Sequence, residues 1–190
     1  PGGYTNLDDA VYYRTLLDRV TSLPGVSVAA LAKPLPGELG GQAAQEPVTL
    51  SGSTRTTEAG VVMGSPGYFE VLGLEFLSGR PFDWHDNAGA PGVAVVSRAL
   101  ARDLIPDGFR AGLRIDVGRL PHHRGLEVVG IVDDASVLNV RETAPRLVYL
   151  STLQQPPPMA RWPGLIVRHR ADATAPRLAT AVDELGHEFV

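Results

Sequence analysis

The segment Asp83-Trp84-His85-Asp86-Asn87 carries the densest set of side chains that are able to bind a metal ion. Hard cations take several oxygen ligands, and Asp83, Asp86 and Asn87 can supply them from one loop. The segment is not an EF-hand loop, because the twelfth position counted from Asp83 is Ala94, where that motif needs a bidentate glutamate. A solvated acidic loop without an ion is the arrangement that we expect.

Two pairs of adjacent ionisable residues are further candidates. His122 and His123 follow Pro121, and adjacent histidines on a strand point to opposite faces, so we expect an exposed turn rather than a shared metal ion. Asp133 and Asp134 end a strongly apolar segment, where two carboxylates can act as a general base or as metal ligands. Such residues more often accept hydrogen bonds from turn N–H groups and cap the following segment, which is the role that we expect.

Several signatures of catalysis are missing from the sequence. The single lysine, Lys33, precedes a proline, so there is no Gly-Lys-Ser/Thr phosphate loop. Gly64-Ser65-Pro66-Gly67 has the wrong spacing for a nucleophile elbow, and no His-Glu-x-x-His or dinucleotide-binding glycine motif is present. The absence of cysteine excludes disulfides, thiol nucleophiles and cysteine-based zinc sites. We therefore predict no catalytic residue, no cofactor-binding residue and no metal ligand in this chain.

The composition indicates an ordinary globular chain. Its 190 residues fit one domain, or one domain with two lobes, and 44% hydrophobic with 20% charged residues excludes full disorder. The net charge is −4, and sixteen arginines and one lysine are scattered rather than clustered, so we predict no nucleic-acid partner. No apolar run reaches the length of a membrane helix, because residues 60–79 are interrupted by Pro66, Glu70 and Glu75. The first residues lack signal-peptide features and a methionine, so we expect a piece of a longer protein.

Apolar periodicity predicts the elements that must position these side chains. Helices are expected at residues 8–23, 65–73, 97–106 and 175–188, and strands at 26–32, 47–51, 59–64, 74–77, 93–96, 113–117, 126–132, 146–150 and 165–168. Ser65 is the predicted N-cap of the second helix, Ser97 caps the third, and Gly73 ends the second. Because helices and strands alternate irregularly rather than as βαβ repeats, the predicted fold class is α+β.

Three aromatic residues and one arginine are assigned structural roles. Tyr68, Phe69 and Trp84 are expected to be packing anchors rather than parts of a cofactor site. Arg80 lies in the turn Gly79-Arg80-Pro81, and we predict that it pairs with a carboxylate and holds that turn. Asp86 is the candidate partner.

An ordered set of short motifs runs through nearly the whole chain. It comprises Leu23-Pro24-Gly25-Val26, the segment from Ser65 to Gly73, Leu77-Ser78-Gly79-Arg80-Pro81-Phe82 with Asp86, Val93 to Ser97, Glu127 to Asp133, Val148-Tyr149-Leu150 and Val167-Arg168. This order resembles the periplasmic core domain of MacB-type ABC transporter permeases, within the FtsX-like permease superfamily, and in particular permeases without a fused ATPase. The sequence departs from the pattern at Ser97-Arg98, where an Asn-Glu pair is common in the family. It also departs at Asp134, which follows Asp133 where the family usually has one aspartate.

The resemblance implies a location, an architecture and a mechanism. It implies a domain on the periplasmic side of the inner membrane, between the first two transmembrane helices of a permease that are absent from this chain. It also implies a porter-like α/β lobe at about 1–65 plus 122–190 and a smaller inserted α+β lobe at about 66–121. A separate cytoplasmic ATPase subunit and a second permease protomer are the implied partners, and a periplasmic adaptor protein is a further candidate. The domain would transmit motion and perform no bond chemistry.

Two other classes of function stay open at the level of sequence. A small soluble metal-dependent hydrolase would need Asp83, His85, Asp86, His123 or Asp133 to converge in one pocket. A free periplasmic ligand-binding protein would need a deep aromatic-lined cleft, and only 6% of the residues are aromatic.

Overall fold

The computed structural model describes residues 9–34, 43–106, 108–119, 121–134, 145–155, 164–170 and 180. The helices in these residues are α1 (Asp9–Thr21), α2 (Tyr68–Leu72) and α3 (Arg98–Leu104), with 3-10 turns η1 (Pro121–His123) and η2 (Thr152–Gln154). The strands are β1 (Val26–Lys33), β2 (Ala44–Leu50), β3 (Thr56–Gly64), β4 (Phe76–Gly79), β5 (Val93–Ser97), β6 (Arg114–Val117), β7 (Leu126–Val132), β8 (Leu147–Ser151) and β9 (Gly164–His169). The predicted α+β class is confirmed, and the helix predicted at 175–188 lies outside the described residues.

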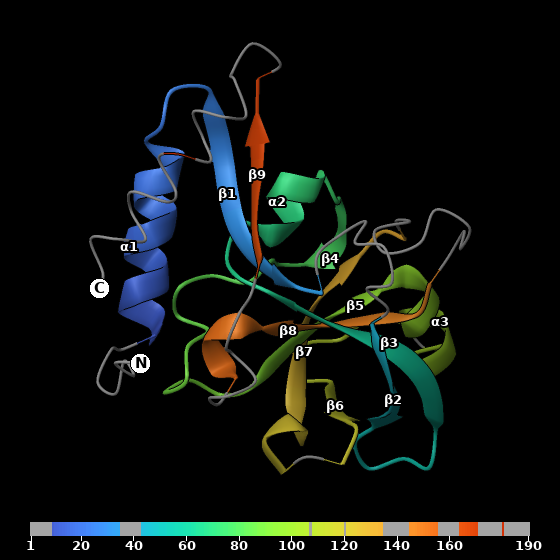
Figure 1. The fold of residues 1–190 in the computed structure, drawn as a ribbon. Helices are drawn as coiled ribbons and strands as arrows, with labels where there is room; N and C mark the ends of the chain where they lie inside the picture. Colours follow the sequence, from blue (N-terminus) through green and yellow to red (C-terminus); the bar gives the residue numbers. More distant parts are fainter. Residues whose placement is uncertain are drawn as a thin grey trace.

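Six strands close into a ring (Figure 1). The hydrogen-bonded order is β2-β6-β7-β5-β8-β3, and β3 pairs again with β2. The β5–β7 and β3–β8 pairs are parallel, and the other four pairs of the ring are antiparallel. A closed ring leaves few free strand edges and is stiffer than an open sheet of the same strands.

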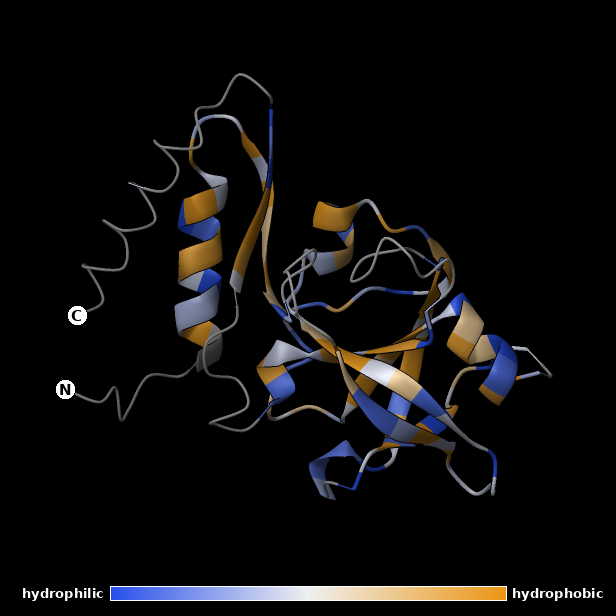
Figure 2. Ribbon diagram, turned by 45° about the vertical axis from the view of Figure 1, so that its right-hand side comes forward, coloured by the Kyte–Doolittle hydropathy of each residue, from blue (hydrophilic) through white to orange (hydrophobic). Residues whose placement is uncertain are grey.

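The inside of the ring is apolar because every second residue of each strand faces inward and these residues are apolar. Hydrophobic positions along the strands of the ring are orange in Figure 2. On β5, Ala94 and Val96 belong to the inner cluster, whereas Val93 and Val95 belong to an outer cluster. The α3 helix contributes Leu100, Ala101, Leu104 and the following Ile105 to the inner cluster. All residues of β5 are buried because apolar clusters cover the strand on both sides. The prediction of a buried strand at this position is confirmed.

The outer cluster is built around the short helix α2. Tyr68 is fully buried and Phe69 is 3% exposed, and their rings lie 5.3 Å apart in an edge-to-face arrangement. Phe69 also lies 5.1 Å from the ring of Tyr149 on β8. The aromatic pair therefore anchors α2 to the outer side of the ring, as the sequence predicted.

A two-stranded arm extends from the ring and carries α1. Strand β1 pairs with β9 along most of its length but with β3 only at Ala32–Gly64 and Lys33–Met63. Leu17 and Val20 of α1 are buried against the arm, on the apolar stripe that the sequence predicted (Figure 1). The arm thus reaches the ring through a short stretch of hydrogen bonds with β3 and through packing against α2.

One predicted helix start is wrong. Ser65 does not cap α2, and Pro66 is not its first residue, because the N-cap is Gly67 in a left-handed conformation. Ser65 is fully buried and its hydroxyl accepts a hydrogen bond from the Leu31 N–H at 2.9 Å. The serine therefore connects β1 to the turn before α2. The predicted end of this helix at Gly73 is confirmed by a left-handed φ of 68°.

Candidate functional site

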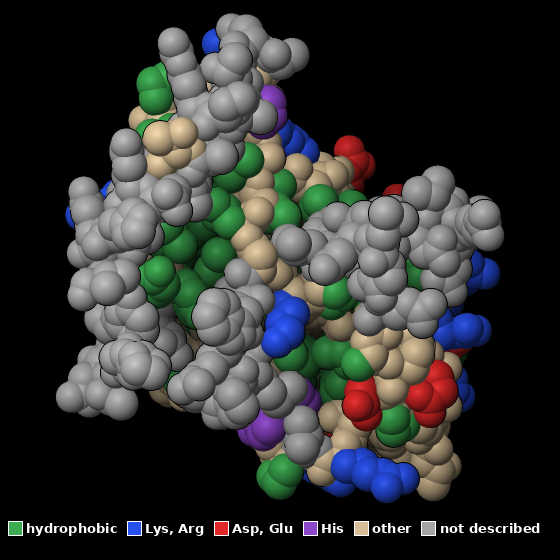
Figure 3. All heavy atoms as spheres, viewed as in Figure 1, with side chains coloured by type: hydrophobic (Ala, Val, Ile, Leu, Met, Phe, Trp, Pro, Cys, Tyr) green, Lys and Arg blue, Asp and Glu red, His purple; other side chains and the backbone are tan. Residues whose placement is uncertain are grey.

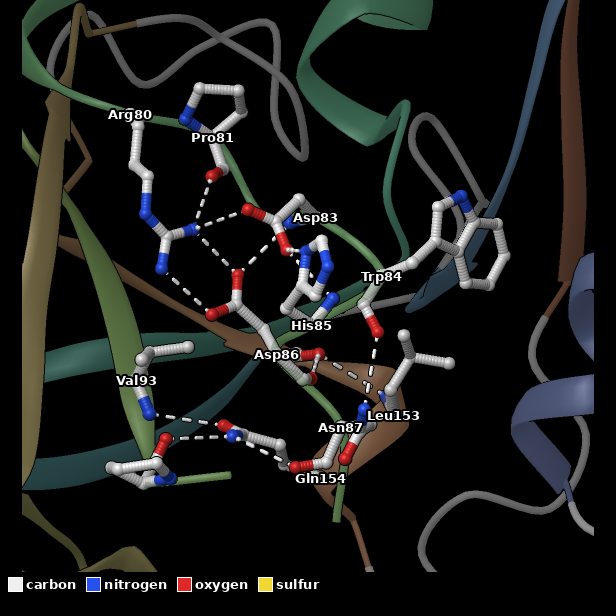
Figure 4. A network of polar contacts seen from close by, with 12 residues as sticks. Arg80, Pro81, Asp83, Trp84, His85, Asp86, Asn87, Val93, Leu153 and Gln154 are labelled. Carbon is white, nitrogen blue, oxygen red and sulfur yellow. Dashed lines mark hydrogen bonds and ion pairs between the residues drawn. The ribbon is translucent and has the colours of Figure 1, made fainter. Parts of the chain in front are cut away.

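The loop at residues 80–92 joins β4 to β5 and carries a buried carboxylate. Asp86 is 3% exposed, and Arg80 donates to it from Nη1 to Oδ2 at 2.7 Å and from Nη2 to Oδ1 at 2.8 Å (Figure 4). The N–H of Asp83 also donates to Oδ2 at 2.9 Å. Bidentate arginine–carboxylate pairs are strong and geometrically specific. The predicted pair is confirmed, and the carboxylate serves to hold the loop.

The remaining members of the candidate metal segment bind within the same loop. His85 donates its N–H to Asp83 Oδ1 at 2.7 Å, and this bond, together with the His85 ring and Arg80, holds the pKa of Asp83 below its ordinary value. Asn87 donates to the Trp84 carbonyl at 3.2 Å. Among the described residues, no three His, Asp or Glu side chains are arranged to hold a metal ion.

The expected solvation of this loop is only partly correct. The His85 side chain is 96% exposed and that of Asp83 is 48% exposed, as a solvated loop requires. Asp86 is buried, contrary to that expectation, because its bidentate contact with Arg80 compensates for the removal of its carboxylate from water.

A second set of hydrogen bonds joins the loop to η2. The Ser151 hydroxyl donates to the Asp86 carbonyl at 3.0 Å. The Gln154 side chain donates to the Pro91 carbonyl at 2.9 Å and accepts from the Val93 N–H at 3.0 Å (Figure 4). These hydrogen bonds hold the loop at Asp86 and again at its end, next to β5. The spacing of residues in the sequence did not predict these contacts between the loop and η2.

The two carboxylates after β7 stabilise an earlier helix. Asp133 forms an ion pair with Arg98 at 2.8 Å, and Asp134 Oδ1 accepts from the Ala99 N–H at 2.8 Å. Both contacts lie at the N-terminus of α3, where negative charge is favourable. The expected capping role is correct in kind, but the capped segment is α3 rather than the following one. The Ser97 hydroxyl accepts from the Leu100 N–H at 3.3 Å, as predicted for the cap of α3.

The expectation of an exposed turn at the histidine pair is only half correct, because His122 is exposed and His123 is buried. His122 and His123 lie on η1 with ring centroids 4.2 Å apart, and His123 is only 5% exposed. The His123 ring Nε2 lies 2.8 Å from Oε1 of Gln155. Histidine side chains gather low on the face shown in Figure 3.

The surroundings of His123 favour its neutral form. Burial is the main cause that lowers the pKa of His123, and the neighbouring His122 adds to it, while Gln155 and Glu46 act in the opposite direction. Because the Gln155 side-chain NH₂ donates to the Ser151 carbonyl at 3.1 Å, its oxygen must accept from His123. Neutral His123 therefore carries its proton on Nε2.

The candidate hydrolase residues consequently do not form one reactive centre in the part of the chain that the structure describes. Asp86 pairs with Arg80, Asp133 pairs with Arg98, and His123 bonds to Gln155. These three pairs lie in three different parts of the fold. The constellation that the hydrolase hypothesis requires is not assembled by these side chains.

One feature that sequence reasoning missed is the contact of α1 with the loop. The Arg14 guanidinium carbon lies 5.5 Å from the centroid of the Trp84 ring. These residues are 70 positions apart, and no local pattern connects them. The contact gives α1 a second attachment to the body of the domain besides the arm.

The fold is shared with solved extracytoplasmic domains. The periplasmic region of MacB from Actinobacillus actinomycetemcomitans superposes with a TM-score of 0.62 and 14% identity, covering 93% of this chain and 73% of that one. A domain of a proposed permease from Porphyromonas gingivalis gives 0.60 and 18% identity, covering 88% and 72%. The extracellular domain of the noncanonic ABC-type transporter YknZ from Gram-positive bacteria gives 0.59 and 13%, covering 93% and 82%.

Sequence comparison identifies the family. No curated protein matches the chain significantly. None of the described helices is long and apolar enough to cross a membrane. Homologous domains are periplasmic or extracellular regions of membrane ABC permeases. The sequence model described as MacB-like periplasmic core domain matches residues 4–185, and the chain therefore belongs to the MacB-like periplasmic core domain family.

Proposed function

We propose that this chain is the extracytoplasmic domain of an ABC transporter permease subunit and that it relays motion powered by ATP hydrolysis on a separate cytoplasmic subunit. The observation that carries the proposal is the family match over residues 4–185. The domain supplies no bond chemistry in this account. Its ionisable side chains maintain the shape through which the motion passes, and the transported compound leaves the inner membrane on the periplasmic side.

The geometry supports a lever made of two stiff parts. The closed ring is one part, and the arm with α1 is the other. Strand β1 of the arm pairs with the ring strand β3 at Ala32–Gly64 and Lys33–Met63, and α2 packs against both the arm and the ring. A displacement of α1 therefore reaches the ring through β3 and α2 and, through Arg14 and Trp84, the loop of residues 80–92. Rigid-body movement of one packed part relative to another is a common form of conformational change in proteins.

The location is tested by thiol labelling, which is simple because the chain contains no cysteine. Leu77 is 47% exposed, and a Leu77→Cys variant of the full-length permease, otherwise free of cysteine, is treated with a membrane-impermeant maleimide in intact spheroplasts. We expect labelling without lysis. Labelling only after lysis would contradict the proposed location. The fully buried Ala94→Cys variant is the matched control and should react only after denaturation.

The partners follow from the same proposal. The permease works as a pair of protomers with its ATPase subunit, and an adaptor protein is a candidate third partner. Copurification of the full-length permease with its ATPase tests the first part. Recovery of a single permease copy per complex would contradict the paired arrangement.

The two-lobe division, about 1–65 plus 122–190 and about 66–121, is part of this proposal. Strand β5 of the second segment pairs with β7 and β8 of the first, so the lobes share hydrogen bonds. We therefore expect both lobes to unfold in one transition. Separate calorimetric transitions would show that they fold independently.

A further inference from the structure

A cavity of about 820 Å³ opens where α1, the loop at residues 80–92, η1 and η2 meet. Its volume falls within the range of roughly 300–1,000 Å³ that is typical of small-molecule sites. Val11 and Arg14 reach it from α1, Trp84 from the loop, and Thr152 from η2. The proposed function does not use this cavity, so its role is a separate question.

Polar side chains make its walls rigid. Gln154 bonds to the Pro91 carbonyl and to the Val93 N–H, and Gln155 bonds to His123 and to the Ser151 carbonyl. Because these two side-chain amides are already hydrogen-bonded to the protein, they do not need to rearrange when a ligand binds. A preformed wall lowers the cost of binding.

One lining group is unsatisfied. Thr152 is 4% exposed, and its hydroxyl has no hydrogen-bond partner among the described residues. The hydroxyl oxygen itself has almost no accessible surface, so it lies behind the cavity wall and a ligand does not reach it. Thr152 therefore lines the cavity with its other atoms.

The charge of the lining selects the ligand class. Among the described residues, the lining includes Arg14, His122 and His123 but no aspartate or glutamate. Arg14 is exposed and lies over the Trp84 ring, so its guanidinium group stays available to an anion. The apolar part of the lining comes from Val93, Leu126, Leu150 and Leu153. A cation would meet no compensating carboxylate from the lining residues that the structure describes.

We propose that this cavity binds an amphipathic organic anion. Its acidic group pairs with Arg14, and its apolar part lies against the apolar part of the lining. Occupancy stabilises the contact between α1 and the rest of the domain, because the ligand touches both.

The test uses three probes that share one ten-carbon tail. Decanoate, decanol and decyltrimethylammonium are titrated below their micelle-forming concentrations into the purified chain, with binding measured by calorimetry. We expect decanoate to bind at one site, decanol more weakly and the cation most weakly. Equal affinity for the three probes, or no binding of decanoate, would overturn the proposal.

Two variants locate the site. Arg14→Gln should weaken decanoate binding by about five- to tenfold, since a charge-assisted hydrogen bond is lost. Arg98→Gln, at an exposed arginine outside the cavity, is the matched control and should leave the affinity unchanged. Unchanged affinity in Arg14→Gln would place the anion elsewhere and refute the assignment.

The second variant is Thr152→Val, which replaces the hydroxyl by a methyl group of similar size. It should raise the urea midpoint of the free chain, because an unpaired buried polar group is removed, and should leave decanoate binding unchanged, because the hydroxyl is not accessible from the cavity. Loss of decanoate affinity in Thr152→Val together with full affinity in Arg14→Gln would place the acidic group at the hydroxyl and refute the assignment to Arg14.

Discussion

Replacing Arg80 by alanine should destabilise the chain more than its surface position suggests. The Asp86 carboxylate is 5% exposed and receives two hydrogen bonds from Arg80 and one from the Asp83 N–H. Arg80→Ala leaves this carboxylate buried with one donor. Breaking a fully buried pair costs about 3–5 kcal/mol, and because the arginine is 45% exposed we expect about 2–3 kcal/mol.

The interaction itself is measured by a double-mutant cycle. Arg80→Ala, Asp86→Ala and the double variant are unfolded in urea, monitored by circular dichroism. We expect a coupling energy of about 1.5–3 kcal/mol, near the upper part of the range for residues in direct contact.

A matched control separates burial from charge pairing. Arg98 is also 45% exposed, and it pairs with Asp133 at 2.8 Å, but that carboxylate is 39% exposed. The Arg98–Asp133 cycle should give only about 0.2–1 kcal/mol, the range for exposed pairs. If the two cycles give the same coupling energy, the burial of Asp86 has no energetic role and the reasoning is refuted.

Three further predictions concern other buried polar groups. Because burial lowers the pKa of His123 from the 6.5 of the unfolded chain, the unfolded state takes up the proton first as the pH falls. The stabilisation that comes from neutral, buried His123 should therefore be complete above about pH 6.5 and decline below it. His123→Gln should make the urea midpoint depend less on pH between about pH 5 and about pH 7. Ser97→Ala should cost about 1–3 kcal/mol in urea unfolding, since the hydroxyl also accepts from the Leu147 N–H at 3.0 Å; a loss below about 0.3 kcal/mol would count against this role. Tyr149→Phe should unfold at the same or a higher urea concentration, because its buried hydroxyl has no partner among the described residues, and a clear loss of stability would show that the hydroxyl is bonded.

Local patterns predicted most of the elements. The strand at 126–132 is correct at both ends, and the buried run of β5 is confirmed, because a strand covered on both faces leaves an unbroken apolar segment. The Arg80–Asp86 pair was predictable because the two residues lie six positions apart in one loop. Ser65 misled the prediction, since a serine before proline fits a helix N-cap as well as a buried connection between strands.

The closure of the ring was not predictable from these patterns. It depends on pairing of β2 with both β3 and β6, and residues 48 and 117 of the latter pair are far apart in the chain. The same holds for the cavity, whose walls come from α1, a loop and two short turns. Alternation of apolar residues reports which side of a strand is buried but not which strand lies beside it.

The central claim is that the domain moves in response to ATP hydrolysis elsewhere. The most direct measurement is the distance between spin labels on Leu77→Cys in the two protomers of the full-length permease, reconstituted with its ATPase subunit. We predict that the distance distribution shifts between the nucleotide-free complex and the complex trapped with vanadate after hydrolysis. An identical distribution in both states, in a complex that hydrolyses ATP at its full rate, would contradict the account.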